Sequence, residues 1–210
     1  MWSTRHQFIL LFICVVMKVV CNAHYKKAKA FQAQKKSGPM LVLCNHMSAL
    51  DFCYFSSPFF FKKINFVVAE NMKYSKPLFA KMIEGYRCIL KKQYYSDFSC
   101  IKNIKRYLDA GISVALCPEG KVAAEGKTGV IPSSIAKLVK WLGYPVATVV
   151  TKGAGLTRPK WAHTLRRGRV DSYCDMLFTA EEVKALSADE VMDKIKSALY
   201  QNEHADQLES

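Results

Sequence analysis

Short apolar runs that alternate with helical patterns are the feature that most limits what this chain can fold into. Runs typical of buried strands are Met40–Cys44, Asn65–Ala69, Tyr86–Leu90, Ile112–Leu116, Val146–Thr151 and Val170–Phe178. Helical patterns occupy Pro77–Glu84, Phe98–Asp109 and Ser133–Leu142. Two capping boxes, Thr179-x-x-Glu182 and Ser187-x-x-Glu190, predict two short helices at the end. The alternation predicts an α/β fold with one mixed, largely parallel sheet covered by helices on both faces.

The length and composition predict a single folded core. The chain has 210 residues, of which 50% are hydrophobic, and no Gly/Ser-rich or proline-rich linker divides it. A chain of this size can bury one sizeable core. We expect residues 1–37 to form an N-terminal apolar helix with a basic membrane-proximal segment, and residues 38–210 to form the domain that carries the activity.

Two polar motifs directly follow predicted strands, which is where α/β enzymes present reactive side chains. The first strand runs into Asn45-His46, and Asp51 follows five positions after the histidine. Histidine titrates near neutral pH, and a carboxylate on one ring nitrogen leaves the other nitrogen able to accept a proton. The second motif is Cys117-Pro118-Glu119-Gly120-Lys121. We expect both motifs to lie at one edge of the sheet.

Four blocks in matching order and spacing carry a family resemblance. They are Asn45-His46-x4-Asp51, Gly85–Lys91, Cys117–Val122 and Tyr144–Ala147, and the later segment Pro159–Gly168 is similar to bacterial members. Through these blocks the chain resembles the glycerolipid acyltransferases that convert lysophosphatidic acid to phosphatidic acid, and the wider lysophospholipid acyltransferase group. The resemblance spans residues 38–200. It implies an α/β core with amino-terminal helical structure at the membrane.

The resemblance implies transfer of a fatty acyl group from an acyl thioester to the hydroxyl of a lysophospholipid, 1-acylglycerol-3-phosphate above all, in phospholipid biosynthesis. His46 would be the general base and Asp51 would orient it, as in hydrolase triads, with the substrate hydroxyl in the place of serine. The donor would be an acyl-CoA or an acyl carrier protein thioester, and neither a metal nor a redox cofactor is required. The expected substrate-binding residues are Asn45, Lys91, Glu119, Gly120 and Lys121.

Two positions depart from the family pattern, and both concern the phosphate of the acceptor. Lys91 replaces an arginine, which exchanges a planar fork of donors for a point charge. Val122 stands where another arginine is usual, so Lys121 remains beside it. Two alternatives therefore stay open: a degenerate, lipid-binding relative, and an acyltransferase for a different lysolipid acceptor.

The charge is strongly basic on the body of the chain. Residues 1–178 contain 28 of the 31 Lys and Arg residues but 9 of the 17 Asp and Glu residues. Such an excess indicates an anionic partner, which is a phospholipid surface, a phosphorylated substrate or a nucleic acid. Because no nucleic-acid-binding motif is present, we expect a membrane and no nucleic acid.

The apolar segment Phe8–Cys21 favours the membrane. It contains 14 residues interrupted by Lys18, fewer than the roughly 20 needed to span a bilayer. It suits a cleaved signal peptide, a short spanning helix, or an uncleaved helix that dips into one leaflet. We favour the last, because lysines follow at once and would hold the domain on the cytoplasmic face of the cell membrane. They are Lys26, Lys27, Lys29, Lys35 and Lys36.

Three further groups have weaker assignments. The eight cysteines show no zinc-binding spacing and are expected to be reduced and mostly buried, with Cys44 or Cys117 as an alternative nucleophile. An apolar cluster after Asp51 suits either the core or an acyl-chain surface: Phe55, Pro58, Phe59, Phe60 and Phe61. A basic cluster beside Trp161 suits either an exposed loop or a lipid headgroup contact: His163, Arg166 and Arg167.

Overall fold

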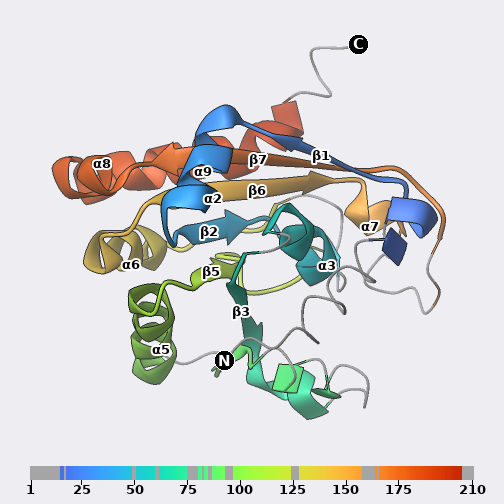
Figure 1. Ribbon diagram of the computed structural model, residues 1–210, viewed down its shortest axis with the longest axis horizontal. Coiled ribbons are helices and arrows are strands. Elements are labelled where there is room, and N and C mark those ends of the chain that lie inside the picture. The colour runs from blue at the N-terminus through green and yellow to red at the C-terminus, as the bar shows by residue number, and fades with distance from the viewer. Residues whose placement is uncertain are drawn as a thin grey trace.

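The structure is a computed structural model that describes residues 15–16, 18–48, 51–59, 62–74, 80–81, 83–84, 87–92, 97–123, 128–157, 164 and 166–204. Over these residues the chain forms one sheet in the order β1-β7-β6-β2-β5-β3-β4 (Figure 1). The strands are β1 (Ala23–Lys27), β2 (Leu41–Cys44), β3 (Ile64–Ala69), β4 (Ile89–Lys91), β5 (Ser113–Leu116), β6 (Val146–Lys152) and β7 (Val170–Phe178). Neighbouring strands are parallel except β6 and β7. The predicted mixed, largely parallel sheet is confirmed.

Helices cover both faces of this sheet. One face packs against α5 (Phe98–Asp109), α6 (Ser134–Leu142), α8 (Ala180–Ala185) and α9 (Ala188–His204). The other face packs against α2 (Lys29–Ser37), α3 (Asp51–Ser56), the 3-10 turn η1 (Ser57–Phe59) and α7 (Ala154–Thr157). A second 3-10 turn, η2 (Glu70–Tyr74), follows β3. The layers therefore agree with the predicted architecture.

The central strand β2 shows why its sequence is apolar throughout. Leu41 and Leu43 point into one core and Val42 and Cys44 into the other, and all four are fully buried. A strand that is covered on both faces has no polar side, so it reads as a continuous hydrophobic run.

The helix ends follow the local sequence signals. Asp97 caps α5, with its side chain accepting from the backbone N–H of Cys100, and Gly143 ends α6 in the left-handed conformation at φ 67°. Both predicted capping boxes form, at Thr179 with Glu182 and at Ser187 with Glu190. However, α9 is 17 residues long, so the prediction of a short last helix was wrong. Its buried residues continue along the sheet: Val191, Met192, Ile195 and Leu199.

β1 and β4 differ most from the sequence-based expectation, whereas the bounds of the other strands agree with it to within one residue. β1 was not predicted, because its residues alternate between buried and exposed positions and include His24 and Lys26 on the open side, as suits an edge strand. β4 begins at Ile89, later than the predicted Tyr86. The residue Arg87 has φ 50°, and its carbonyl accepts from Asn65 and Tyr107, so the chain turns just before the strand.

The aromatic cluster after Asp51 lies in the core where it is described. Phe55 and Phe59 are 3% and 0% exposed, and Pro58 is also buried. Phe59 meets Phe31 of α2 edge-to-face, with ring centroids 5.4 Å apart. Phe60 and Phe61 lie outside the described residues.

The amino-terminal apolar segment is described only in part. Residues 15–16 and 18–20 are helical, and Cys21 is fully buried against the domain. Most of Phe8–Cys21 and half of the predicted helix Pro77–Glu84 lie outside the described residues; residues 80–81 and 83–84 of that helix are described and are helical. Among the helices that the structure describes, none is both long and apolar enough to cross a membrane.

Candidate active site

The two polar motifs lie at the same edge of the sheet. β2 and β5 are parallel neighbours, with Leu43 opposite Leu116. His46 follows β2 by two residues and Glu119 follows β5 by three, so both emerge at the carboxyl ends of adjacent strands. This is the edge at which open α/β sheets bind ligands.

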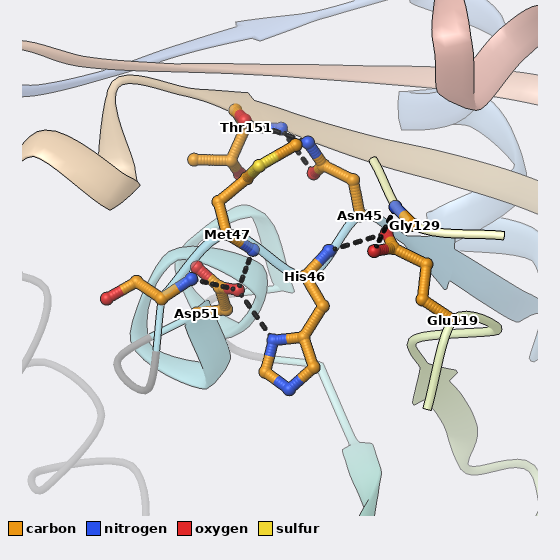
Figure 2. A network of polar contacts seen from close by, with 8 residues as sticks. Asn45, His46, Met47, Asp51, Glu119, Gly129 and Thr151 are labelled. Carbon is orange, nitrogen blue, oxygen red and sulfur yellow. Dashed lines mark hydrogen bonds and ion pairs between the residues drawn. The ribbon is translucent and has the colours of Figure 1, made fainter. Parts of the chain in front are cut away.

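His46 and Asp51 are in direct contact. The Nδ1 atom of His46 lies 2.9 Å from Oδ2 of Asp51. The same carboxylate oxygen accepts the backbone N–H groups of Met47 at 2.6 Å and Ser48 at 2.8 Å. Asp51 is the first residue of α3, where a negative charge is favoured by the helix dipole. Figure 2 shows the three contacts converging on one oxygen.

This geometry assigns the roles of the two imidazole nitrogens. Asp51 is 2% exposed, and burial raises the pKa of its carboxyl, although the hydrogen bond from His46 acts to lower it. Oδ2 of Asp51 accepts two backbone N–H groups and therefore faces the ring as an acceptor. Nδ1 of His46 is then the donor, and Nε2 is left with the lone pair of the neutral ring. Nε2 points away from Asp51 in Figure 2, and the His46 side chain is 26% exposed. The ring is therefore arranged to accept a proton from a group outside the core.

Glu119 contacts the backbone beside the imidazole. It is 9% exposed, and its Oε1 accepts the N–H of His46 at 2.9 Å while its Oε2 accepts the N–H of Gly129 at 2.7 Å. Burial raises the pKa of this carboxyl, and the two N–H groups act to lower it. The N–H of Ala123 donates to the carbonyl of His46 at 2.7 Å. The loop after β5 thus holds both polar groups of the His46 backbone.

Asn45 joins two strands beyond the end of β2. Its Nδ2 donates to the Thr151 carbonyl at 2.9 Å, and its Oδ1 accepts the Thr151 N–H at 2.8 Å. Asn45 is fully buried. Thr151 in turn lies 3.1 Å from Ser172 through their hydroxyl oxygens. In this structure the amide of Asn45 therefore contacts backbone, whereas the sequence placed Asn45 among the substrate-binding residues.

The other predicted ligands are exposed and fall into two places. Gly120, at φ 70°, and Lys121 lie in the segment between Glu119 and Ala123, close to His46. Lys91 is the last residue of β4. β4 is three strands away from β2 in the sheet, which corresponds to about 14 Å. The segment that contains Lys121 thus contacts the His46 backbone through Glu119 and Ala123, whereas Lys91 lies farther along the same edge.

A pocket of about 290 Å³ lies beside β4 and α5, not at the imidazole. Its lining includes Glu70, Lys92, Arg106 and Tyr107, but neither His46 nor Lys91. In the part of the chain that the structure describes, no three His, Cys, Asp or Glu side chains are grouped so as to hold a metal ion.

The cysteines beside the site are poorly suited to nucleophilic attack. Burial, and then the nearby charge of Asp51, holds the pKa of the Cys44 thiol well above its usual value. Burial does the same to Cys117, with Cys44 and Asp51 adding to it. Because the thiolate is the nucleophile, the imidazole is the better candidate for the reactive group.

Sequence reasoning missed Gly129, Thr151 and Ser172. Each contributes through a backbone group or a buried hydroxyl, and no spacing along the chain indicates such contacts. In the predicted basic cluster, Arg166 and Arg167 are exposed. Trp161 and His163 lie outside the described residues.

Comparison with known proteins shows the family of the chain and a similar fold. The sequence model of the Acyltransferase family matches residues 23–152. Among solved structures, the 1-acyl-sn-glycerophosphate (LPA) acyltransferase PlsC from Thermotoga maritima is similar, with a TM-score of 0.73 and 17% sequence identity over 100% of this chain and 84% of that chain. A search of curated proteins found no match. At this identity the structural likeness concerns the fold. Because the family match spans more than half of the sequence and includes His46, Asp51 and Glu119, the chain belongs to the Acyltransferase family.

Proposed function

We propose that this protein transfers a fatty acyl group from an acyl thioester to the free hydroxyl of a lysophospholipid, with 1-acylglycerol-3-phosphate as the leading acceptor, in phospholipid biosynthesis. The observation that carries the proposal is the contact of 2.9 Å between Nδ1 of His46 and the buried carboxylate of Asp51. It leaves Nε2 as a base on the exposed side of the ring.

The reaction needs one group that accepts a proton from the acceptor hydroxyl and later gives it to the leaving group. As the acceptor hydroxyl attacks the thioester carbonyl carbon, its proton passes to Nε2 of His46. Asp51 stabilises the imidazolium that forms. The carbon–sulfur bond then breaks, and the leaving thiolate takes the proton from the imidazolium. A simple thiol has a pKa near 8.5, so its thiolate leaves with little assistance. No electrons are gained or lost, and the proposal includes no metal or redox cofactor.

The acceptor phosphate is assigned to Lys121 first and Lys91 second. The hydroxyl and the phosphorus of a glycerol phosphate are separated by four bonds, about 5 Å. Lys121 lies in the segment that contacts the His46 backbone, which suits this short separation, whereas Lys91 lies three strands away. Gly120 supports the turn that presents Lys121. Lys91 and Val122 stand where the family usually has arginine, so lysophospholipids with other headgroups are the second candidate for the acceptor.

We also propose that the enzyme works at the cytoplasmic face of the cell membrane, held through its amino-terminal helix. Val15 and Val19 in the described part of that segment are 52% and 68% exposed. The exposed lysines that follow, Lys26, Lys29 and Lys36, suit an anionic lipid surface.

The test is an acyl-transfer assay of the full chain in detergent. Acyl-CoA and acyl carrier protein donors are crossed with lysophospholipids that differ in headgroup, and product is measured by mass spectrometry. His46→Ala is expected to abolish transfer, while His24→Ala, an exposed histidine on β1, serves as the matched control. Transfer that persists in His46→Ala would overturn the proposal.

The phosphate assignment has its own comparison. Lys121→Ala is expected to raise the KM for phosphate-bearing acceptors more than for unphosphorylated monoacylglycerol, because only the former loses an ionic contact. Lys137→Ala, on the exposed side of α6, is the control. Equal effects on both acceptors would remove Lys121 from the phosphate site.

A further inference from the structure

The carboxylate of Glu119 is committed to the protein backbone. Of its two oxygens, one accepts from the N–H of His46 and the other from the N–H of Gly129. Figure 2 shows Glu119 and Asp51 approaching the His46 segment from opposite sides. Glu119 as a whole is 9% exposed, so it has little surface left for a ligand.

We propose that Glu119 is a positioning residue that fixes the backbone of His46, and through it the imidazole, instead of binding the acyl acceptor. This inference rests on the proposed function for its kinetic consequences, although the structural part stands on the contacts alone. It gives Glu119 a role different from the one that the sequence predicts.

Three separate contacts of His46 fix the position of its imidazole. Glu119 holds the N–H of His46, Ala123 holds its carbonyl, and Asp51 holds Nδ1 of the ring. With the backbone and one ring nitrogen fixed, the direction of Nε2 is also fixed. The bond to Glu119 is partly buried, and with an ionised carboxylate as acceptor it is stronger than a bond between neutral groups.

Two substitutions remove this contact in different ways. In Glu119→Gln the side chain keeps one oxygen, and its NH₂ group faces the second backbone N–H as donor against donor. In Gly129→Ala the carboxylate stays, but a Cβ at position 129 would lie 3.0 Å from Oε2 of Glu119 and press it away. The backbone at Gly129 lies outside the left-handed region, so alanine fits it. Gly38→Ala is the matched control, since its Cβ would meet only Nε2 of Gln34 at 3.8 Å.

The kinetic test separates positioning from acceptor binding. A misplaced base is expected to lower kcat by about 10–100-fold, with an unchanged KM for the acceptor, in both Glu119→Gln and Gly129→Ala. Gly38→Ala is expected to retain wild-type values. A raised acceptor KM with an intact kcat in Glu119→Gln would make Glu119 an acceptor ligand. An intact kcat in both variants would also overturn the proposal, and Gly129→Ala decides alone if Glu119→Gln does not fold.

A spectroscopic test does not depend on activity. The chain has five histidines, so ¹⁵N-histidine labelling of the full-length protein in detergent gives few amide signals, and His46→Gln assigns the one at position 46. Both variants are expected to move the His46 amide proton upfield and to weaken the downfield ring N–H signal that reports the contact with Asp51. An unchanged ring signal in both variants would contradict positioning, even if the wild-type protein transferred no acyl group. If the variants show these signal changes but the wild type transfers no acyl group, the proposed function is wrong and the positioning role of Glu119 stands.

Discussion

The carboxylate of Asp51 uses its two oxygens unequally. Oδ2 accepts three N–H groups, whereas Oδ1 is buried and has no partner among the described residues. An asparagine can place its amide oxygen at the position of Oδ2 and its NH₂ group at the position of Oδ1. Asp51→Asn is therefore expected to fold and to keep the imidazole in place, but to lose the charge that stabilises the imidazolium.

Activity follows from that lost charge. Asp51→Asn is expected to lower kcat by about 10²–10⁴-fold, measured as acyl transfer under saturating donor and acceptor. Asp109→Asn, an exposed carboxylate at the end of α5, is the control. Full activity in Asp51→Asn would show that the carboxylate does not support the base.

Asp51 supports activity as a carboxylate, but its burial is expected to make the folded protein less stable when that carboxyl ionises. Burial raises the pKa of Asp51 in the folded protein above its ordinary value of 3.8, so the folded state binds more protons than the unfolded state between the two pKa values. The contribution of Asp51 to the free energy of unfolding should therefore fall as the pH rises through that window. Asp51→Asn has no carboxyl at this position and therefore lacks this pH-dependent contribution to stability.

Chemical denaturation at a series of pH values checks this expectation. The stability of Asp51→Asn relative to the wild type should increase as the pH rises above 3.8. A relative stability that decreases over the same range would mean that the carboxylate stabilises the fold by ionising.

At the scale of single residues, the sequence predicted the pair but not its supports. His46 and Asp51 are five positions apart, so their contact follows from a short local turn. The contact of Glu119 with His46 spans 73 positions, and that of Asn45 with Thr151 spans 106. Such contacts depend on how separate strands end beside one another, which a local pattern does not record. The substrate-binding roles of Lys91, Gly120 and Lys121 stay predictions.

At the scale of elements, Asn45 joins β2 to β6 where their ladder ends. Its side chain accepts and donates one hydrogen bond with the backbone of Thr151 in a fully buried place. In Asn45→Asp, the oxygen that replaces Nδ2 would face the Thr151 carbonyl without a proton between them. We expect a loss of about 1–3 kcal/mol in the free energy of unfolding.

Urea denaturation at neutral pH measures this loss. Asn103→Asp, a half-buried asparagine on α5, controls for the added charge. Equal stabilities of Asn45→Asp and Asn103→Asp would show that the junction of β2 and β6 does not need the amide.

Elements with a strong apolar pattern were predictable. The bounds of α5 and β7 agree with those predicted, because their buried residues repeat at helical and strand spacing and their ends carry Asp97, Gly111 or a capping box. β1 was not predictable, because an edge strand with one open side needs few apolar residues. The start of β4 depends on the left-handed conformation of Arg87, which its residue type does not indicate.

At the scale of the whole molecule, the excess of basic residues is expected to attract the protein to an anionic lipid surface. The formal net charge is +14 at pH 7. Binding of the full chain to vesicles is expected to be stronger for anionic than for zwitterionic lipid, and to weaken as salt rises. Co-sedimentation with vesicles of phosphatidylcholine alone, or mixed with phosphatidylserine, measures the difference. Equal, salt-independent binding to both would assign the attachment to the apolar segment alone.

The proton acceptor Nε2 of His46 is the centre of the proposed chemistry, and one measurement tests it most directly. Purified full-length wild type, His46→Ala and His24→Ala are assayed side by side for acyl transfer from an acyl thioester to a lysophospholipid. The expected result is product from the wild type and His24→Ala and none from His46→Ala, with all three proteins folded. Product at the wild-type rate from His46→Ala would contradict the assignment of His46 as the base.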